Sequence, residues 1–478
     1  MVRVQDWDAV LDAVDGPVRS YLASLPDRTV GHDVHPDEVR AAVQSHLSTV
    51  GELPADVVAD MAATLEPYIT AHSSGRFFGF VIGGLHPAAY GAELLTATWD
   101  QNAGLYAPTP GVTIIEEIAA GWLVEQLRLP ADSSVAFVTG GQMANWTCLA
   151  AARDHVLRAV GWDVEADGLI GAPQLHVVVK QSVHSTVPRA LRYLGLGDRT
   201  AIEVAVDDND GIDLDSLQAT LEGLQGPTIV CVESGNVNTG AFDPFDKVAE
   251  LVEAHRARGN PSWVHVDGAV GLLAAATESG RHLTAGIERM DSWSTDGHKL
   301  LNVAYDCGIA ICADRKAHFA AMSVRASYLR QSDGGVREPM DWNPEFSRRA
   351  RGMGVYATLR SLGVVGLDQL VARVCMLAQR FARGLARSGR AEVLNDVVFN
   401  QVLVRWIPPE GVDADVFNDA ITDATAADGR TYFSGTTWHG QRLMRIAVSD
   451  WATDEADVDL AMQVLLELAD EAVATLRP

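Results

Sequence analysis

Residues 291–302 have the sequence DSWSTDGHKLLN, in which a short β-rich run ends at a polar turn that carries Lys299. This lysine is one of four in the chain, against 33 arginines (37 basic residues minus 4). A guanidinium keeps its proton in proteins, whereas a lysine amine can lose its proton and act as a nucleophile. A lysine kept here, in a chain that otherwise uses arginine, points to covalent chemistry at the end of a strand.

The same order, a β-rich run followed by a polar turn, recurs on both sides of this stretch. The runs are SVAFVTG, LHVVVK, PTIVCVES, SWVHVDG and CGIAICAD, and Ala- and Leu-rich segments of helical periodicity separate them. Alternating strands and helices predict a mostly parallel sheet covered by helices, which we assign to a large domain over residues 71–360. In such sheets, ligands bind at the carboxyl ends of the strands.

A chain of 478 residues exceeds the size at which a single core stops growing, so more than one domain is expected. Two further segments flank the large domain. Apolar residues recur at three- and four-residue spacing in residues 1–70, which predicts an N-terminal helical segment. Residues 361–478 contain a long helical pattern over residues 363–389 and then strands that alternate with helices, which predicts a smaller C-terminal α+β domain.

The charge and the cysteines exclude several classes of protein. The net charge of −26 argues against nucleic acid or an anionic membrane as a partner. No apolar run approaches about eighteen residues, and the N-terminus carries acids where a signal peptide would carry basic and then apolar residues, so we expect a cytoplasmic protein. The five cysteines are odd in number and have no C-x-x-C spacing, which indicates reduced thiols, with neither a disulfide framework nor a metal site.

A candidate anion site lies where the strand VAFVTG runs into Gly140 and Gly141, with a helix predicted to begin near Gln142. Glycines let backbone N–H groups approach an anion, and a helix N-terminus adds partial positive charge. A Gly-Gly turn also occurs as simple punctuation between a strand and a helix, and this one lacks the lysine of a P-loop. The turn therefore indicates an anion site only in combination with other signals.

Two more polar residues follow strands. His184 comes after LHVVVK, and Asp267 ends SWVHVD, 32 residues before Lys299. Each has an ordinary alternative: a structural histidine, a capping or turn aspartate, a solvated lysine. Together, an anion cradle, an imidazole, a carboxylate and an amine at successive strand ends fit one cofactor. Pyridoxal phosphate needs a phosphate site, a partner stacked on its ring, an acid on its pyridinium nitrogen and a lysine that forms a Schiff base.

These segments resemble the group II pyridoxal-phosphate-dependent amino-acid decarboxylases, the family of aromatic-amino-acid, tyrosine and glutamate decarboxylases. The resemblance extends from about residue 75 to 455 and rests on motifs in the family's order: GFVIGGLHPAAYGAELL, GGQMAN, HSTVPRAL, GNVNTGAFDP, HVDGAVG, DGHKLLNVAYDCG, FSRRARG and RIAVSDWATDEADVD. It implies the aspartate-aminotransferase-like α/β fold (fold type I), with a mostly parallel seven-stranded sheet. It also implies a homodimer in which the N-terminal helices embrace the partner.

The resemblance assigns roles to individual residues. Lys299 would carry the cofactor as a Schiff base, His184 would stack on the pyridine ring, and Asp267 would keep the ring nitrogen protonated. The other cofactor contacts that it implies are the phosphate ligands Gly141, Gln142 and His298, the ring contact Ala269 and the polar contact Asn238. The chain departs from the family at Leu300, where an aromatic residue is usual, and at Gly268, where alanine is usual, which bears on substrate fit.

The resemblance also implies the reaction, which is conversion of an L-amino acid to its amine and carbon dioxide. Tyr328 lies in SVRASYLRQSDGGVREPMDW, and SYLRQ resembles the TYLKH type of segment that carries the catalytic-loop tyrosine of aromatic-amino-acid decarboxylases. This tyrosine would donate the proton that Cα needs after carbon dioxide leaves. The alternative is an exposed loop aromatic with no catalytic part.

Other outcomes of the same cofactor stay open. An aminotransferase would need an arginine that binds the substrate carboxylate, and Arg445 in MRIAVSDW is a candidate. In aldehyde-forming relatives the loop tyrosine is typically phenylalanine, so Tyr328 argues against that variant. A non-catalytic cofactor-binding protein would predict loss of Lys299 or Asp267.

Substrate identity is the least determined feature. Aromatic residues at the family's pocket positions favour an aromatic amino acid, and an acidic substrate would instead need a second cation. The pocket candidates are Phe77, Phe78, Phe80, Tyr106, Trp438 and Arg445, and the candidate cations are Arg76 and Arg442.

Overall fold

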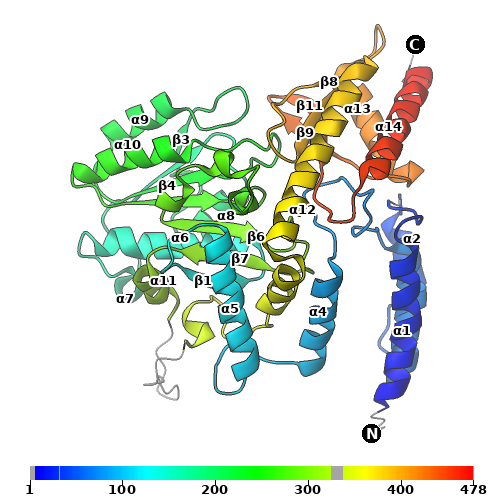
Figure 1. Ribbon diagram of the computed structural model, residues 1–478, viewed down its shortest axis with the longest axis horizontal. Helices are drawn as coiled ribbons and strands as arrows, with labels where there is room; N and C mark the ends of the chain where they lie inside the picture. The colour runs from blue at the N-terminus through cyan, green and yellow to red at the C-terminus, as the bar shows by residue number, and fades with distance from the viewer. Residues whose placement is uncertain (1–5, 32, 324–336, 477–478) are drawn as a thin grey trace.

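The computed structural model describes residues 6–31, 33–323 and 337–476, in a helical N-terminal segment, a large sheet with its helices, and a small α+β part (Figure 1). The N-terminal segment contains three helices, as its periodicity predicted. They are α1 (Trp7–Ser24), α2 (Pro36–Ala42) and α3 (Pro54–Leu65). None of them has a buried residue, and α1 stands apart from the large sheet in Figure 1.

The large sheet has seven strands, as expected from the resemblance. They are β1 (Ser134–Val138), β2 (His176–Lys180), β3 (Ile202–Val204), β4 (Thr228–Glu233), β5 (Ser262–Asp267), β6 (Ser292–Asp296) and β7 (Gly308–Cys312). Their order is β1-β7-β6-β5-β4-β2-β3, and only β7 runs antiparallel to its neighbours. The mostly parallel sheet is therefore confirmed, and its strands end side by side.

Both faces of this sheet are buried, because successive side chains of a strand point to opposite faces. In β1, Val135 and Phe137 join one hydrophobic core, while Ala136 and Val138 join a second core on the other face. Helices cover both cores. They are α4 (Pro87–Trp99), α5 (Pro110–Gln126), α6 (Gly141–Arg158), α7 (Val164–Asp167), α8 (Thr186–Tyr193), α9 (Leu214–Gly223), α10 (Phe245–Ala257) and α11 (Arg315–Met322).

The C-terminal part contains a four-stranded antiparallel sheet with the order β10-β11-β9-β8. Its strands are β8 (Ala391–Val393), β9 (Gln401–Trp406), β10 (Ser434–Trp438) and β11 (Gln441–Ala447), and its helices are α13 (Ala414–Asp428) and α14 (Glu455–Leu476). Short 3₁₀ turns elsewhere span Glu66–Tyr68, Leu272–Ala276, Arg281–Thr284, Ile287–Arg289 and Pro339–Asp341.

Helix α12 (Gly352–Ser388) joins the two sheets, and the sequence pattern placed its start too late, at residue 363. The helix begins at Gly352 and is interrupted at Gly363, whose backbone (φ 60°, ψ −176°) is not helical. Only glycine adopts this conformation readily, because it has no Cβ. Within the described part of the chain, α12 alone is long and apolar enough to cross a membrane by length and composition.

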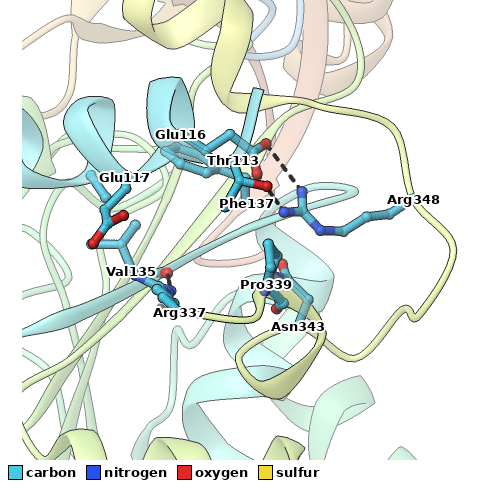
Figure 2. Close-up of a pocket in the computed structure, with 10 residues that line it drawn as sticks. Thr113, Glu116, Glu117, Val135, Phe137, Arg337, Pro339, Asn343 and Arg348 are labelled. Carbon is cyan, nitrogen blue, oxygen red and sulfur yellow. Dashed lines mark hydrogen bonds and ion pairs between the residues drawn. The ribbon is translucent and has the colours of Figure 1, made fainter. Parts of the chain in front are cut away.

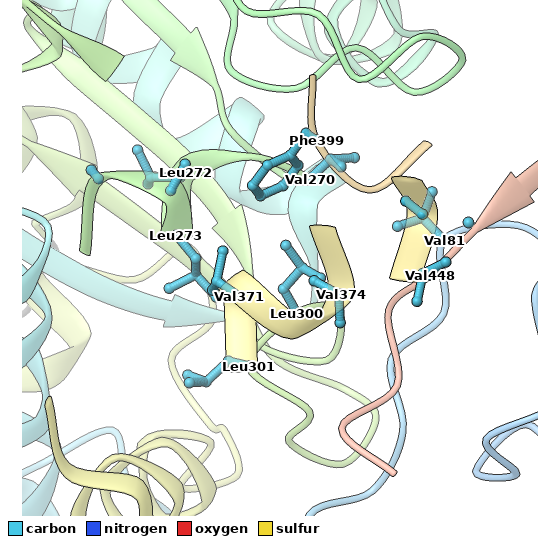
Figure 3. Packing of buried hydrophobic residues seen from close by; sticks show 14 of the residues in the cluster. Val81, Val270, Leu272, Leu273, Leu300, Leu301, Val371, Val374, Phe399 and Val448 are labelled. Atoms are coloured by element: carbon cyan, nitrogen blue, oxygen red, sulfur yellow. The ribbon is translucent and has the colours of Figure 1, made fainter. Parts of the chain in front are cut away.

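One hydrophobic core includes residues of both sheets and the two leucines that follow Lys299 in the chain (Figure 3). Leu300 and Leu301, which follow the lysine, pack there with Val371 and Val374 of α12. The core also takes in Val270, Leu272, Leu273, Phe399, Val448 and Val81. The departure from the family at Leu300 therefore falls in this core, where the side chain is 1% exposed. All five cysteines are free, as expected for reduced thiols.

Candidate active site

Lys299 lies in the turn after β6, next to the carboxylate that ends this strand. Its Nζ is 2.9 Å from Oδ2 of Asp296, and the Asp296 side chain is 4% exposed. The other oxygen, Oδ1, accepts a hydrogen bond of 2.5 Å from the backbone N–H of Gly141. Asp296 therefore joins the lysine to the glycine turn at the start of α6, although the sequence pattern did not single it out.

Asp267 ends β5, beside β6, and is held by side chains from other elements. Its Oδ2 accepts from Nδ2 of Asn145 at 2.8 Å and from Oγ1 of Thr186 at 3.3 Å. Burial alone would raise the pKa of Asp267, but the charge of His184, the Asn145 hydrogen bond and the charge of Lys299 outweigh it and keep this pKa low. Asp267 is thus a buried carboxylate that stays ionised and can hold a proton on a cationic ring.

His184 lies in the turn after β2, close to the same carboxylate. Its Nδ1 is 2.8 Å from Oγ1 of Thr186, whose hydroxyl also contacts Asp267. Its backbone N–H donates to Oε1 of Glu233 at 2.9 Å. Ala269 is near as well, since its backbone N–H donates to Oδ1 of Asp267 at 3.1 Å. The structure therefore brings His184, Asp267 and Lys299 together at the ends of β2, β5 and β6.

The glycine turn fits a phosphate. Gly140 has φ +153°, a conformation that residues with a side chain rarely adopt, and it precedes the first residue of α6. Next to it, the buried Oε1 of Gln142 has no hydrogen-bond partner among the described residues. The N-terminus of α6 suits an anionic group, although the Gly141 N–H itself donates to Asp296, and the unpaired Gln142 oxygen is an acceptor that needs a donor instead.

His298 lies against this turn with a defined tautomer. Its Nδ1 accepts from the backbone N–H of Cys307 at 3.1 Å, so the ring proton is on Nε2, which faces Oδ1 of Asp296 at 3.4 Å. Burial lowers the pKa of His298. The ring also stacks on Tyr305, with centroids 4.2 Å apart. His298 therefore directs its N–H donor towards Asp296, next to the glycine turn.

A second group of predicted residues lies at the small sheet. Arg445 of β11 donates from Nη1 to Oδ1 of Asn238 at 3.4 Å and to the carbonyl of Val237 at 3.3 Å. Its Nε has no partner, and no carboxylate of the described residues pairs with it. Burial lowers the pKa of Arg445 to about 10. The guanidinium of Arg445 therefore has a free donor and can bind an anionic group. Asn238 contacts Arg445 and not the residues at the strand ends.

The aromatic pocket candidates separate into two sets. Phe80 is 50% exposed, and Tyr106 is half-buried, whereas Phe77 and Phe78 are buried in the core, where Phe78 packs on Phe381. The sequence-based assignment of Phe77 and Phe78 to a pocket is not supported, because neighbouring rings cover both side chains. Their position in the chain could not show this, since aromatic residues bury large areas wherever tertiary contacts allow.

The other cations are occupied. Arg76 donates to the backbone carbonyls of Arg28 at 2.7 Å and Arg430 at 2.9 Å, and Arg442 pairs with Asp419 at 3.1 Å. Both are committed to structural contacts and are poor candidates for the second cation that an acidic substrate would need.

Tyr328, the predicted proton donor, lies outside the described residues, which resume at residue 337. The chain that follows is well anchored (Figure 2). The Arg348 guanidinium pairs with the buried Glu116 of α5, whose Oε1 also accepts from the backbone N–H of Gly352 at 2.9 Å. Arg337 donates to the carbonyl of Val135 in β1. These contacts fix the described chain between Arg337 and Gly352.

A buried acid lies behind the Lys299 turn and gives the fold a pH dependence. Asp450 is 1% exposed, its Oδ1 accepts from the backbone N–H of Ala452 at 2.7 Å, and its Oδ2 has no partner among the described residues. Burial raises the pKa of Asp450 to about 7; Asp457 adds to this and Arg373 opposes it. The folded protein thus holds a proton that the unfolded chain loses near pH 4.

The sign of the effect follows from this difference. As pH rises from about 4 to about 7, the unfolded chain binds fewer protons than the folded one, so the free energy of unfolding falls. The side chain of Asp450→Asn does not titrate, so this variant does not lose stability as the pH rises. We expect its free energy of unfolding to exceed that of the parent by roughly 1–3 kcal/mol near pH 8 and to equal it near pH 4. Urea unfolding at both pH values measures this. An equal difference at both pH values would contradict the assignment.

Comparison with known proteins agrees with this site. The family model of the pyridoxal-dependent decarboxylase conserved domain matches residues 36–407. The chain is 27% identical over 485 residues to tryptophan decarboxylase 1 of Oryza sativa subsp. japonica, covering 95% of this chain and 92% of that relative. It is 24% identical over 443 residues to phenylacetaldehyde synthase of a Rosa hybrid cultivar, covering 88% and 85%. The crystal structure of Oryza sativa TDC with PLP and tryptamine has the same fold, with a TM-score of 0.89, 24% identity and 100% coverage of both chains.

The fold and the site define an enzyme that uses pyridoxal phosphate. Since the family model covers more than half of the chain, the protein belongs to the pyridoxal-dependent decarboxylases and is a carboxy-lyase with this cofactor.

Proposed function

We propose that the enzyme converts an L-amino acid, preferentially an aromatic one, to its amine and carbon dioxide, with Lys299 holding the cofactor as a Schiff base. The observation that carries the proposal is the convergence of Lys299, Asp267 and His184 at the ends of β6, β5 and β2 of one sheet, in a chain of the decarboxylase family. Relatives named for tryptophan and tyrosine decarboxylation support the aromatic preference.

The chain's own residues supply binding, orientation and proton control. Bound pyridoxal phosphate acts as an electron sink that lets a bond at Cα break. Asp267 stays ionised and would hold a proton on the ring nitrogen, and the N-terminus of α6 at Gly141 and Gln142, with His298, would hold the phosphate. Asp296 contacts the amine of Lys299 at 2.9 Å and can accept the proton that this amine must lose before it attacks carbon.

Two alternatives on the same scaffold have specific support. Arg445 lacks a carboxylate partner, which suits an aminotransferase that holds the substrate carboxylate. One relative is a phenylacetaldehyde synthase, which suits oxidative formation of an aldehyde. Tyr328 favours the amine product over the aldehyde, because it provides a proton donor for Cα.

The deciding experiment is a panel of the common L-amino acids, assayed with added pyridoxal phosphate for carbon dioxide, amine, aldehyde and keto acid. Amine and carbon dioxide in equal amounts from an aromatic substrate would support the proposal. Keto acid without carbon dioxide would instead identify an aminotransferase, and aldehyde with peroxide an aldehyde synthase.

We also propose a cytoplasmic homodimer. Exposed apolar side chains on the N-terminal helices, among them Trp7 (71% exposed) and Leu11 (63%) of α1, would be covered by a second copy. An apolar groove of about 470 Å³ between α1 and α3, lined by Val14, Val18, Met61 and Leu65, extends this surface. Sedimentation should give twice the mass of the chain, and a fully active monomer at low concentration would refute the dimer.

A further inference from the structure

Lys180 is one of the four lysines and takes no part in the site described above. It ends β2, is 0% exposed, and its Nζ contacts Oε2 of Glu233 at 2.8 Å, Oδ1 of Asp243 at 3.3 Å and the carbonyl of Asp210 at 2.9 Å. These contacts use all three donors of the ammonium group. Burial lowers the pKa of Lys180, but the two carboxylates outweigh it and raise this pKa, so the side chain stays charged.

Glu233 ties this lysine to the proposed cofactor site. It ends β4, between β2 and β5, and each carboxylate oxygen has its own partners. Oε1 accepts from the backbone N–H of His184 at 2.9 Å, while Oε2 accepts from Nδ2 of Asn236 at 3.0 Å and from Lys180. One carboxylate therefore holds the backbone of the ring-stacking histidine and the turn that follows β4.

The same contacts extend to the small sheet. Oδ1 of Asn236 accepts from the backbone N–H of Asn238 at 2.9 Å, and Asn238 contacts Arg445 of β11. On the other side of Lys180, Oδ2 of Asp210 accepts from Nε1 of Trp438 at 2.8 Å. Lys180, Glu233 and Asp243, which we call the Lys180 cluster, are thus linked to the β10–β11 hairpin through two separate routes.

Stability alone does not account for this arrangement. Burying three charges is costly, and replacing buried ion pairs by apolar residues is often neutral or stabilising. What a charged cluster provides and an apolar one does not is a fixed set of directional contacts. We propose that Lys180 and Glu233 are positioning residues: the Lys180 cluster holds His184, the Asn236–Asn238 turn and the Trp438 hairpin in one arrangement around the cofactor. This inference rests on the proposed function in assigning His184 to the cofactor ring.

Glu233→Gln tests the inference with little change in volume. It leaves Lys180 paired with Asp243, and the backbone N–H groups of Ile212 and Glu233 still satisfy Asp243. An amide has one acceptor oxygen where the carboxylate has two, so either His184 or the Lys180–Asn236 side must lose its acceptor. In the purified holoenzyme we expect an altered visible circular dichroism of the bound cofactor and a kcat/KM lower by about 10- to 100-fold, since small misplacements near a reacting centre have effects of this size.

Glu250→Gln is the matched control, because it removes the same charge from an exposed pair with Lys247 at 3.1 Å. It should match the wild type in dichroism and kcat/KM. The inference is overturned if folded, cofactor-loaded Glu233→Gln shows unchanged dichroism and a kcat/KM within two-fold of wild type, whatever its melting temperature. The dichroism is measured without substrate. If Glu233→Gln changes the dichroism but the wild-type enzyme makes no amine, the proposed function is contradicted and this inference is still supported.

If Glu233→Gln does not fold, the double variant Lys180→Met, Glu233→Leu replaces it. This variant removes one positive and one negative charge together and leaves only Asp243, which keeps its two backbone donors. The same two outcomes then decide: altered dichroism with lowered kcat/KM supports the inference, and wild-type values overturn it.

Discussion

Lys299→Ala is expected to eliminate covalent retention of pyridoxal phosphate and to lower the rate of decarboxylation by roughly 10⁴-fold or more, the size of effect seen when an essential catalytic group is removed. No other lysine can replace it. Lys180 is locked in a buried cluster, and Lys247 and Lys316 are exposed on α10 and α11, outside the group formed by Asp267 and His184.

The measurement is borohydride reduction of the purified protein, followed by mass spectrometry of its peptides. The wild type should carry the reduced cofactor on Lys299, and the variant should carry none. Lys316→Ala is the matched control, since it removes an exposed lysine of α11 and should retain both label and activity. Label on another lysine in Lys299→Ala would refute the assignment of the cofactor lysine.

The strand ends could be predicted from sequence because the signal there is local. At the ends of β1, β2, β5 and β6, short strand-forming runs give way to glycines or polar residues, and parallel strands bring these ends to one edge. His184, Asp267 and Lys299 were found in this way, together with the glycine turn at Gly141. The rarity of lysine added a signal that depended only on composition.

The supporting contacts could not be predicted, because they join residues far apart in the chain. Asn145 contacts Asp267 across 122 positions, and Arg445 contacts Asn238 across 207. Asp296 could have been predicted from its position three residues before Lys299, but an aspartate at a strand end is also an ordinary turn residue. The Lys180 cluster shows the same limit: each member ends a strand or follows one, and only the sheet order places them together.

The helical residues of α12 before Gly363 and the burial of Phe77 and Phe78 could not be predicted for a related reason. The sequence pattern predicts a helix only from residue 363, whereas α12 begins at Gly352 and continues past the break at Gly363. For the two aromatic rings, the decision between core and pocket depends on Tyr432, Phe433 and Phe381, which pack on them from the C-terminal part of the chain.

Tyr328→Phe is expected to lower amine formation by about 10²- to 10⁴-fold, the usual contribution of a general acid. The prediction rests on the sequence, since SYLRQ resembles the catalytic-loop segment of aromatic-amino-acid decarboxylases and Tyr328 lies outside the described residues. Removing one hydroxyl leaves cofactor binding and loss of carbon dioxide intact, because the groups assigned to those steps are Lys299, Asp267 and His184. What the variant lacks is the proton for Cα.

Two products can follow when that proton is withheld. The electron pair left at Cα is either protonated by a slower donor or reacts with oxygen, which gives an aldehyde, ammonia and peroxide. Amine, carbon dioxide and peroxide should therefore be followed together, with the substrate that the panel selects. Tyr193→Phe, at an exposed position at the end of α8, is the matched control and should behave as the wild type. An unchanged amine yield without peroxide in Tyr328→Phe would mean that another group delivers the proton, and His184, which lies beside Asp267, would be the next to test.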